Sequence, residues 1–332
     1  MARIPLPGAC LAAFFLITPA GIVCQSPYEI PQVSVTPRPK PKGPVDPTRL
    51  PEIHLRVDSS LVLIPAQVTT PGGTSVTSLS QDNFKLFEEG VEQKITHFSQ
   101  EDGPISIGLL FDSSGSMKNK VLQSSEAAAA FLRTANSDDE FFLIEFGDRP
   151  KLAVPFTPDA DEIFRRILHN RPEGRTSLLD AILMSLVEMK HARNTRKAIV
   201  ILSDGGDNSS HYTPHQIRNA LLESDLQLYA IGIFDRNPPR RQPAEERNGR
   251  QLLDDLAEQT GGRLYTVDNL DDLVYTSARI SRDLRSQYVI GYSPSNQTRD
   301  AKYRSVKLKV ISPEGTPSLR TYYRRGYYAP SQ

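Results

Sequence analysis

The chain contains no tryptophan and only two cysteines, and neither charge sign dominates, with 39 Lys and Arg against 39 Asp and Glu in 332 residues. A net charge near zero supplies no overall field that would attract nucleic acid or an anionic membrane. Long apolar runs are missing after the extreme N-terminus, so no later segment is expected to span a bilayer. Both cysteines, Cys10 and Cys24, lie in or beside that first segment. The folded part is therefore expected to lack disulfides, Cys-ligated zinc and a Cys nucleophile.

Residues 1–25 have the parts of a secretory signal peptide. A short basic start is followed by an apolar run over 9–17, too short for a spanning helix, and by small residues around Pro19. We therefore expect an exported protein, whether periplasmic, on the cell surface or secreted. Cleavage after Ala20 and cleavage shortly after Cys24 both fit the pattern. An uncleaved signal anchor and a lipoprotein acylated at Cys24 are the alternatives.

Residues 26–52 are rich in proline, with Arg and Lys between the prolines and few large apolar side chains. Such a stretch buries too little surface to offset its ordering entropy, so we expect an extended linker. A polyproline ligand for an aromatic groove is the functional alternative.

Residues 104–284 alternate branched apolar strands with helical patterns. Continuous apolar runs such as 198–202 are expected where helices cover both faces of a parallel sheet. The predicted fold class is therefore α/β, a doubly wound and mostly parallel sheet. Strands are predicted at 105–111, 140–146, 197–202, 227–233 and 263–267, and helices at 120–135, 160–169, 178–191, 214–223, 252–259 and 270–285.

The two flanking stretches, 53–103 and 285–328, have the alternating, branched and aromatic pattern of strands separated by turns. A hairpin is predicted between 84–87 and 95–98. Neither flank has enough residues for a core of its own. We therefore expect the N- and C-terminal β segments to pair into one small β-sandwich, with the α/β domain inserted between them and 329–332 left as a tail.

Oxygen donors gather in the loop 111–117, at the carboxyl end of the first predicted α/β strand. In open α/β sheets, the loops after these strand ends form the ligand crevice. Asp112, Ser114 and Ser116 offer one carboxylate and two hydroxyls at alternating positions, which suit Mg²⁺ or Mn²⁺. Gly115 permits the tight turn that aims all three inward.

Two more donors are expected at the same edge. Thr176 precedes a predicted helix and supplies a hydroxyl, and Asp204 follows a predicted central strand and supplies a carboxylate. One or two carboxylates, a few hydroxyls and water make an incomplete octahedron that leaves one coordination position for an outside ligand. Asp207 is interpreted as a turn residue, with an outer-shell role as the alternative.

The positions Asp112, Ser114, Ser116, Thr176 and Asp204 resemble the metal-ion-dependent adhesion site (MIDAS) of von Willebrand factor type A (VWFA) domains, in order and in placement along the chain. The whole arrangement is similar to exported bacterial proteins with a VWFA-related domain. This resemblance implies a Rossmann-like fold and one divalent metal, Mg²⁺ with Mn²⁺ or Ca²⁺ as alternatives. The three hydroxyls would hold the metal directly, the two carboxylates directly or through water, and an Asp or Glu of a partner protein would complete the shell.

One departure from the family concerns the residues just after the loop. Integrin-type domains place acidic residues there for a second, adjacent metal, whereas this chain has Lys118-Asn119-Lys120. We therefore predict one metal site rather than two. Positive charge beside the site should weaken metal binding somewhat and favour an anionic partner.

The predicted function is that of an exported protein-binding module that acts in adhesion or interaction and is not an enzyme. A nucleophile elbow of the Gly-x-Ser-x-Gly type, a phosphate loop and a dinucleotide fingerprint are all missing from the sequence. Two alternatives remain open: a structural cell-envelope assembly protein with a stabilising metal, and, more remotely, a metal-dependent hydrolase. No nucleic-acid partner is expected, and the oligomeric state is left open.

Overall fold

The computed structural model describes residues 61–101, 103–234, 244–267, 270–313 and 318–331. The described elements all belong to one contact unit, Val57–Gln332. The predicted signal peptide, the linker and the strand pattern at 53–57 lie outside the described residues.

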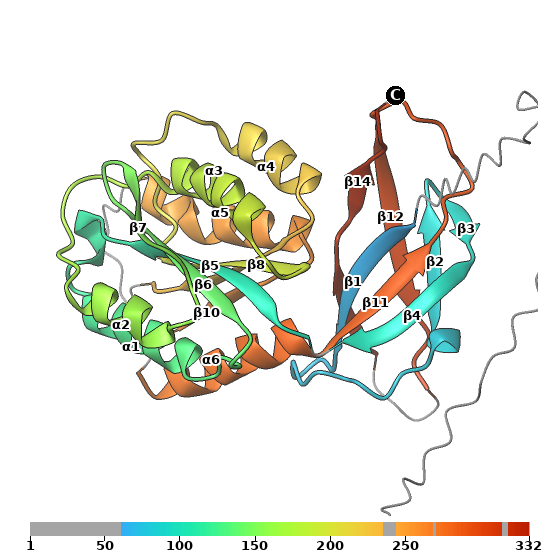
Figure 1. The fold of residues 1–332 in the computed structure, drawn as a ribbon, viewed down its shortest axis with the longest axis horizontal. Coiled ribbons are helices and arrows are strands. Elements are labelled where there is room, and N and C mark those ends of the chain that lie inside the picture. Colours follow the sequence, from blue (N-terminus) through green and yellow to red (C-terminus); the bar gives the residue numbers. More distant parts are fainter. Residues whose placement is uncertain (1–60, 102, 235–243, 268–269, 314–317, 332) are drawn as a thin grey trace, which may run out of the picture. The chain divides into compact units, whose positions relative to one another are not determined.

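A six-stranded sheet with the order β10-β9-β8-β5-β6-β7 forms the centre of the α/β part (Figure 1). Its strands are β5 (Ile105–Asp112), β6 (Glu140–Phe146), β7 (Pro150–Thr157), β8 (Arg196–Ser203), β9 (Gln227–Gly232) and β10 (Leu264–Thr266). Every pairing is parallel except that of the edge strand β7, which runs antiparallel to β6. The mostly parallel sheet expected from the sequence is thus confirmed.

Helices cover both faces of this sheet, which explains why its strands are apolar runs. They are α1 (Val121–Leu132), α2 (Ala160–Leu168), α3 (Leu178–Glu188), α4 (Pro214–Glu223), α5 (Ala244–Gln259) and α6 (Leu270–Arg285). Along β5, Leu109 and Phe111 belong to a buried cluster that includes side chains of α1, α2 and α6. Leu110, between them, belongs to a second cluster with side chains of α3, α4 and α5. Because successive strand residues point to opposite faces, each of these runs contributes to two cores.

The flanking segments form two four-stranded antiparallel sheets, with the orders β13-β1-β11-β4 and β14-β12-β2-β3. The strands are β1 (Val62–Thr69), β2 (Phe84–Glu88), β3 (Val91–Gln93), β4 (Ile95–Glu101), β11 (Gln287–Tyr292), β12 (Tyr303–Val310), β13 (Arg320–Tyr323) and β14 (Gly326–Tyr328). Each sheet mixes strands from before and after the α/β part, and one buried cluster draws on both sheets. The predicted pairing of the two flanks into a sandwich is confirmed.

The hairpin predicted between 84–87 and 95–98 is wrong in its second strand. β2 pairs with β3, across a turn in which Glu89 and Gly90 have φ of 48° and 84°. Positive φ at both central residues is typical of the tight type I′ turn. The strand β3 that follows this turn is only three residues long. After Lys94 the chain enters the other sheet, where β4 pairs with β11.

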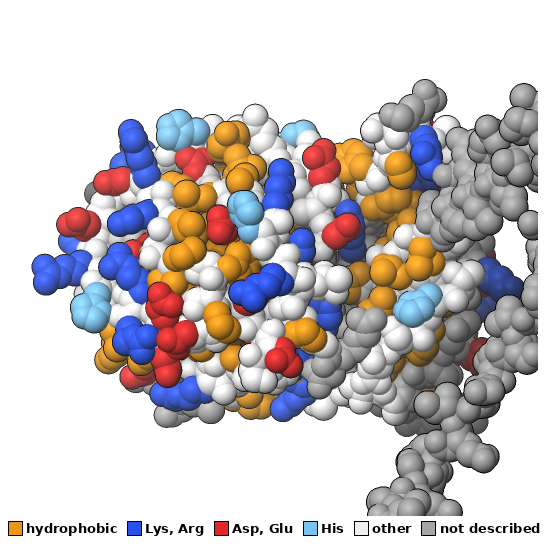
Figure 2. Space-filling view, in the orientation of Figure 1, with side chains coloured by type: hydrophobic (Ala, Val, Ile, Leu, Met, Phe, Trp, Pro, Cys, Tyr) orange, Lys and Arg blue, Asp and Glu red, His pale blue; other side chains and the backbone are white. Residues whose placement is uncertain are grey.

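The surface of the α/β part carries both charge signs. Figure 2 shows Lys and Arg side chains interspersed with Asp and Glu, with hydrophobic side chains between them. Within the described ranges, no helix has both the length and the apolarity that crossing a bilayer requires.

Candidate metal centre

The fold brings the two candidate carboxylates to one position. Asp112 is the last residue of β5 and Asp204 directly follows β8, and these two strands are neighbours in the sheet. From β5 the chain first adds β6 on one side and later returns to add β8 on the other side, so the strand order reverses between β5 and β8. Such a switch point opens a crevice at the carboxyl ends of the strands.

Asp112 is held by two hydrogen bonds and is only 1% exposed. Its Oδ1 accepts from the backbone N–H of Ser114 at 2.9 Å, and its Oδ2 accepts from the hydroxyl of Ser203 at 2.6 Å. The hydroxyl oxygens of Ser114 and Ser116 lie 3.1 Å apart. The loop after β5 therefore places one carboxylate and two hydroxyls in a single small space.

Thr176 is fixed by the loop that carries Asp204. Its backbone N–H donates to Oδ1 of Asn208 at 2.9 Å, and its carbonyl accepts from the backbone N–H of Asn208 and of Ser209. The loop containing Thr176 also meets the first loop, because the carbonyl of Gly174 accepts from the N–H of Gly115 at 3.0 Å. Three loops far apart in sequence thus form one hydrogen-bonded unit.

Two supporting residues of this unit were absent from the predicted set. Ser203 orients Asp112, and Asn208 orients Thr176. Asp207, expected to be a turn residue or an outer-shell group, accepts from the N–H of Leu178 at the start of α3 and from the hydroxyl of Ser210. The sequence signal for these roles was weak, since polar residues after a strand are common in any loop.

Lys120 contributes a buried positive charge within the candidate centre. From the sequence, this charge was expected only beside the site. Its Nζ lies 2.9 Å from Oδ2 of Asp204, and the two side chains are 8% and 5% exposed. Lys118, which has the same charge two residues earlier, is exposed. The two lysines after the loop therefore have different electrostatic environments.

The electrostatics of the centre show a surplus of negative charge. Burial and, to a smaller extent, the nearby carboxylate of Asp204 raise the pKa of Asp112 to about 7, and the hydrogen bonds from Ser114 and Ser203 partly oppose this rise. With both carboxylates ionised, Lys120 offsets one of the two negative charges. A cation bound here would relieve the repulsion between the two carboxylates.

The donors present suit a hard divalent cation. Two carboxylates and three hydroxyls are the oxygen ligands that Mg²⁺ and Mn²⁺ prefer, and sulfur or imidazole is not needed. Within the described part of the chain, no three His, Cys, Asp or Glu side chains gather into a group that could bind a metal, either at this centre or elsewhere. The candidate centre depends on hydroxyls, and its residues fit the ion that the sequence motif implies.

In the presence of a chelator, the protein is expected to be more stable at pH 5 than at pH 8. Folded Asp112 keeps its proton up to about pH 7, whereas the unfolded side chain loses it near the ordinary pKa of 3.8. The folded state therefore binds more protons in this range, and raising the pH removes stability, on the order of 2–4 kcal/mol. Urea unfolding at several pH values measures the slope. Asp112→Asn should flatten it, and an unchanged slope would assign the dependence to other groups.

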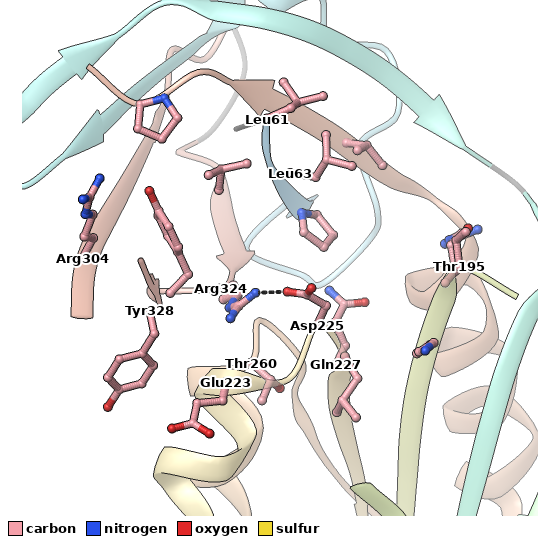
Figure 3. Close-up of a pocket in the computed structure, with 18 of the residues that line it drawn as sticks. Leu61, Leu63, Thr195, Glu223, Asp225, Gln227, Thr260, Arg304, Arg324 and Tyr328 are labelled. Atoms are coloured by element: carbon pink, nitrogen blue, oxygen red, sulfur yellow. Dashed lines mark hydrogen bonds and ion pairs between the residues drawn. The ribbon is translucent and has the colours of Figure 1, made fainter. Parts of the chain in front are cut away.

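A pocket of about 780 Å³ lies at the other end of the same strands. Its lining includes Ile105 at the start of β5 and Arg196 at the start of β8, while the candidate centre stands where these strands end. Figure 3 shows Leu61 and Leu63 at one side of it, and an ion pair between Arg324 and Asp225. The pocket contains none of the predicted site residues and is separate from the candidate centre.

The loop 235–247, expected from its length and polarity to influence partner choice, falls largely on 235–243, outside the described residues. Its last part belongs to α5. The suggested role in specificity stays a prediction.

The family match found by comparison with known proteins lies in the α/β part. Residues 107–206 match the family model of the von Willebrand factor type A domain. A curated relative from Borreliella burgdorferi, named as an uncharacterized protein, is 24% identical over 169 residues, which cover 46% of this chain and 49% of the relative. The chain thus spans about half the length of that relative.

Solved structures of low sequence identity are also similar. A von Willebrand factor type A protein from Catenulispora acidiphila is 12% identical with a TM-score of 0.45, covering 74% of this chain and 76% of that one. Proximal thread matrix protein 1 from the mussel byssus, described with a zinc-occupied MIDAS motif, is 18% identical with a TM-score of 0.46, covering 58% and 49%. BatB from Bacteroides thetaiotaomicron is 16% identical with a TM-score of 0.44, covering 55% and 100%.

Proposed function

Since the chain contains a von Willebrand factor type A domain, we propose that it is an exported, non-enzymatic protein-binding module that captures an acidic side chain of a partner through a divalent metal. The observation that carries the proposal is the pair of buried carboxylates at the switch point of the sheet, Asp112 and Asp204, with the adjacent hydroxyls of Ser114 and Ser116 in the loop after β5. Binding at such a site depends on the loops around it, because a carboxylate gives up its water only where the rest of the surface fits.

Each candidate ligand, and each residue that supports one, has a defined role in this proposal. Ser114, Ser116 and Thr176 would hold the metal directly, and Asp112 and Asp204 would hold it directly or through water. The metal, Mg²⁺ with Mn²⁺ or Ca²⁺ as alternatives, supplies a positive charge and a free coordination position for a carboxylate. Ser203 and Asn208 keep the ligands oriented before any partner arrives. Such preorganisation lowers the cost of binding.

Thermal unfolding of the protein with Mg²⁺, Mn²⁺, Ca²⁺ or a chelator tests the metal site. A ligand of the native state raises stability by mass action, by about 2.7 kcal/mol at 100 times its Kd. The wild type should be stabilised by at least one ion, and Asp112→Ala should lose that stabilisation entirely. Asp161→Ala, which removes an exposed carboxylate on α2, is the matched control and should respond as the wild type does.

Three outcomes would change the assignment. An ion-dependent shift that survives in Asp112→Ala would contradict this site. No shift with any ion would contradict a metal at this centre, and partner binding that is indifferent to chelator would favour the structural alternative, a cell-envelope assembly protein. Turnover of a substrate that is lost in Asp112→Ala would favour the metal-dependent hydrolase.

A further inference from the structure

Lys120 is a buried cation inside the candidate centre. It precedes α1 in the chain, and its Nζ donates to Oδ2 of Asp204 at 2.9 Å. The side chains are 8% and 5% exposed, which is rare for lysine unless it is paired. The other oxygen of Asp204, Oδ1, accepts from the N–H of Gly206 at 3.3 Å. The ammonium and the backbone N–H thus lie at different oxygens of the Asp204 carboxylate.

An ammonium and a metal ion cannot share this oxygen favourably. A protonated lysine only donates hydrogen bonds and has no lone pair with which to bind a metal. Two cations at one buried carboxylate also repel each other, and this repulsion is much stronger in a protein interior than in water. Lys120 and a divalent ion therefore compete for Oδ2 of Asp204.

We propose that Lys120 is a tethered competitor of the metal, so that its ammonium leaves Asp204 whenever the ion binds. This inference rests on the proposed function, because it requires a metal at this centre. In the metal-free protein Lys120 neutralises Asp204 and keeps the centre folded. The price is a lower metal affinity, so the ion is held only when its concentration, or a partner carboxylate, outweighs the lysine.

Amine acetylation followed by mass spectrometry tests the displacement directly. The full chain is treated with a limiting amount of acetylating reagent, in chelator or in the ion that stabilises the wild type. Lys120 should be protected in chelator and should react at least ~3-fold faster with the ion, because a buried ion-paired amine reacts slowly. Lys118 is exposed and should react equally in both conditions. An ion that stabilises the protein while Lys120 stays protected would overturn the proposal.

Substitution of the lysine tests the competition through affinity. Lys120→Met removes the competitor, so calorimetric titration of the same ion should show binding about tenfold tighter than in the wild type. Lys118→Met carries the same charge change at an exposed position and should stay within ~2-fold of the wild type. Unchanged or weaker binding in Lys120→Met would refute competition.

Stability measurements separate competition from a structural role. In chelator, Lys120→Met should melt below the wild type, because Asp204 loses its partner, and the difference should shrink when the ion is added. An equal loss with and without the ion would mean that Lys120 is structural. Lys120→Gln, which keeps a hydrogen-bond donor without the charge, replaces Lys120→Met if the latter does not fold. If the wild type binds no ion, the proposed function fails first, and the inference fails with it.

Discussion

Replacing Glu88 with Ala is expected to lower the free energy of unfolding by about 3–5 kcal/mol, the cost of breaking a buried ionic group that several partners share. Glu88 is 2% exposed, and its Oε2 accepts from the hydroxyls of Tyr292 at 2.7 Å and Tyr327 at 2.8 Å. Its Oε1 lies 3.5 Å from Nη1 of Arg304. Glu88 precedes the α/β part and its three partners follow it, so the substitution tests whether the flanks fold as one sandwich.

Equilibrium unfolding in urea measures this loss. Glu92→Ala is the matched control, since Glu92 is only four residues away and forms an exposed pair with Lys85, with side chains 50% and 56% exposed. Such surface pairs contribute about 0–1 kcal/mol. If Glu88→Ala cost no more than Glu92→Ala, the sandwich core would not depend on this cluster.

Gly205→Ala is expected to destabilise the protein by about 2–4 kcal/mol and to abolish metal-dependent stabilisation. Gly205 has a φ of 80°, and a Cβ there would overlap the backbone of Gly249 in α5. The loop must shift to make room, and it carries Asp204 on one side and Asp207 on the other. The melting temperature in chelator should fall, and the rise in melting temperature that the ion causes in the wild type should disappear.

Gly90→Ala isolates the effect of the overlap from that of the backbone conformation. Gly90 has a nearly equal φ of 84°, but a Cβ there would meet nothing within 4 Å. This control should cost only about 1 kcal/mol and should leave the metal response intact. Equal costs at the two glycines would mean that the contact with Gly249 is not important for the loop.

Most of the fold was predictable because its patterns are long and regular. The apolar run 198–202 indicated a doubly covered parallel strand, and counting residues in the flanks was enough to predict that they pair. The strand β7 was missed, because Pro150 and Pro155 interrupt its pattern, and prolines of this kind belong to edge strands. The assignment of 95–98 to a hairpin failed because the sequence around Lys94 contains no signal that the chain passes from the sheet of β3 to the sheet of β4.

The meeting of Asp112 and Asp204 at one edge of the sheet was predictable from the sequence, whereas the contacts around them were not. Asp112 and Asp204 follow strands of the sheet, so topology brings them together. Lys118 and Lys120 look equivalent in the sequence, and only the direction in which the chain enters α1 buries one of them. The hydrogen bond between Asn208 and Thr176 likewise depends on how two loops meet, and the spacing of residues in the sequence does not predict this contact.

The order in which the strands pair has a consequence for synthesis of the chain. In its sheet β1 lies between β11 and β13, both of which come after the α/β part. A ribosome adding ~5–20 residues per second takes on the order of 10–40 s to pass from the end of β1 to the start of β11. During that time an apolar strand is without its partners, exposed to self-association. Until β11 and β13 are synthesised, β1 therefore has neither of its neighbours in the sheet.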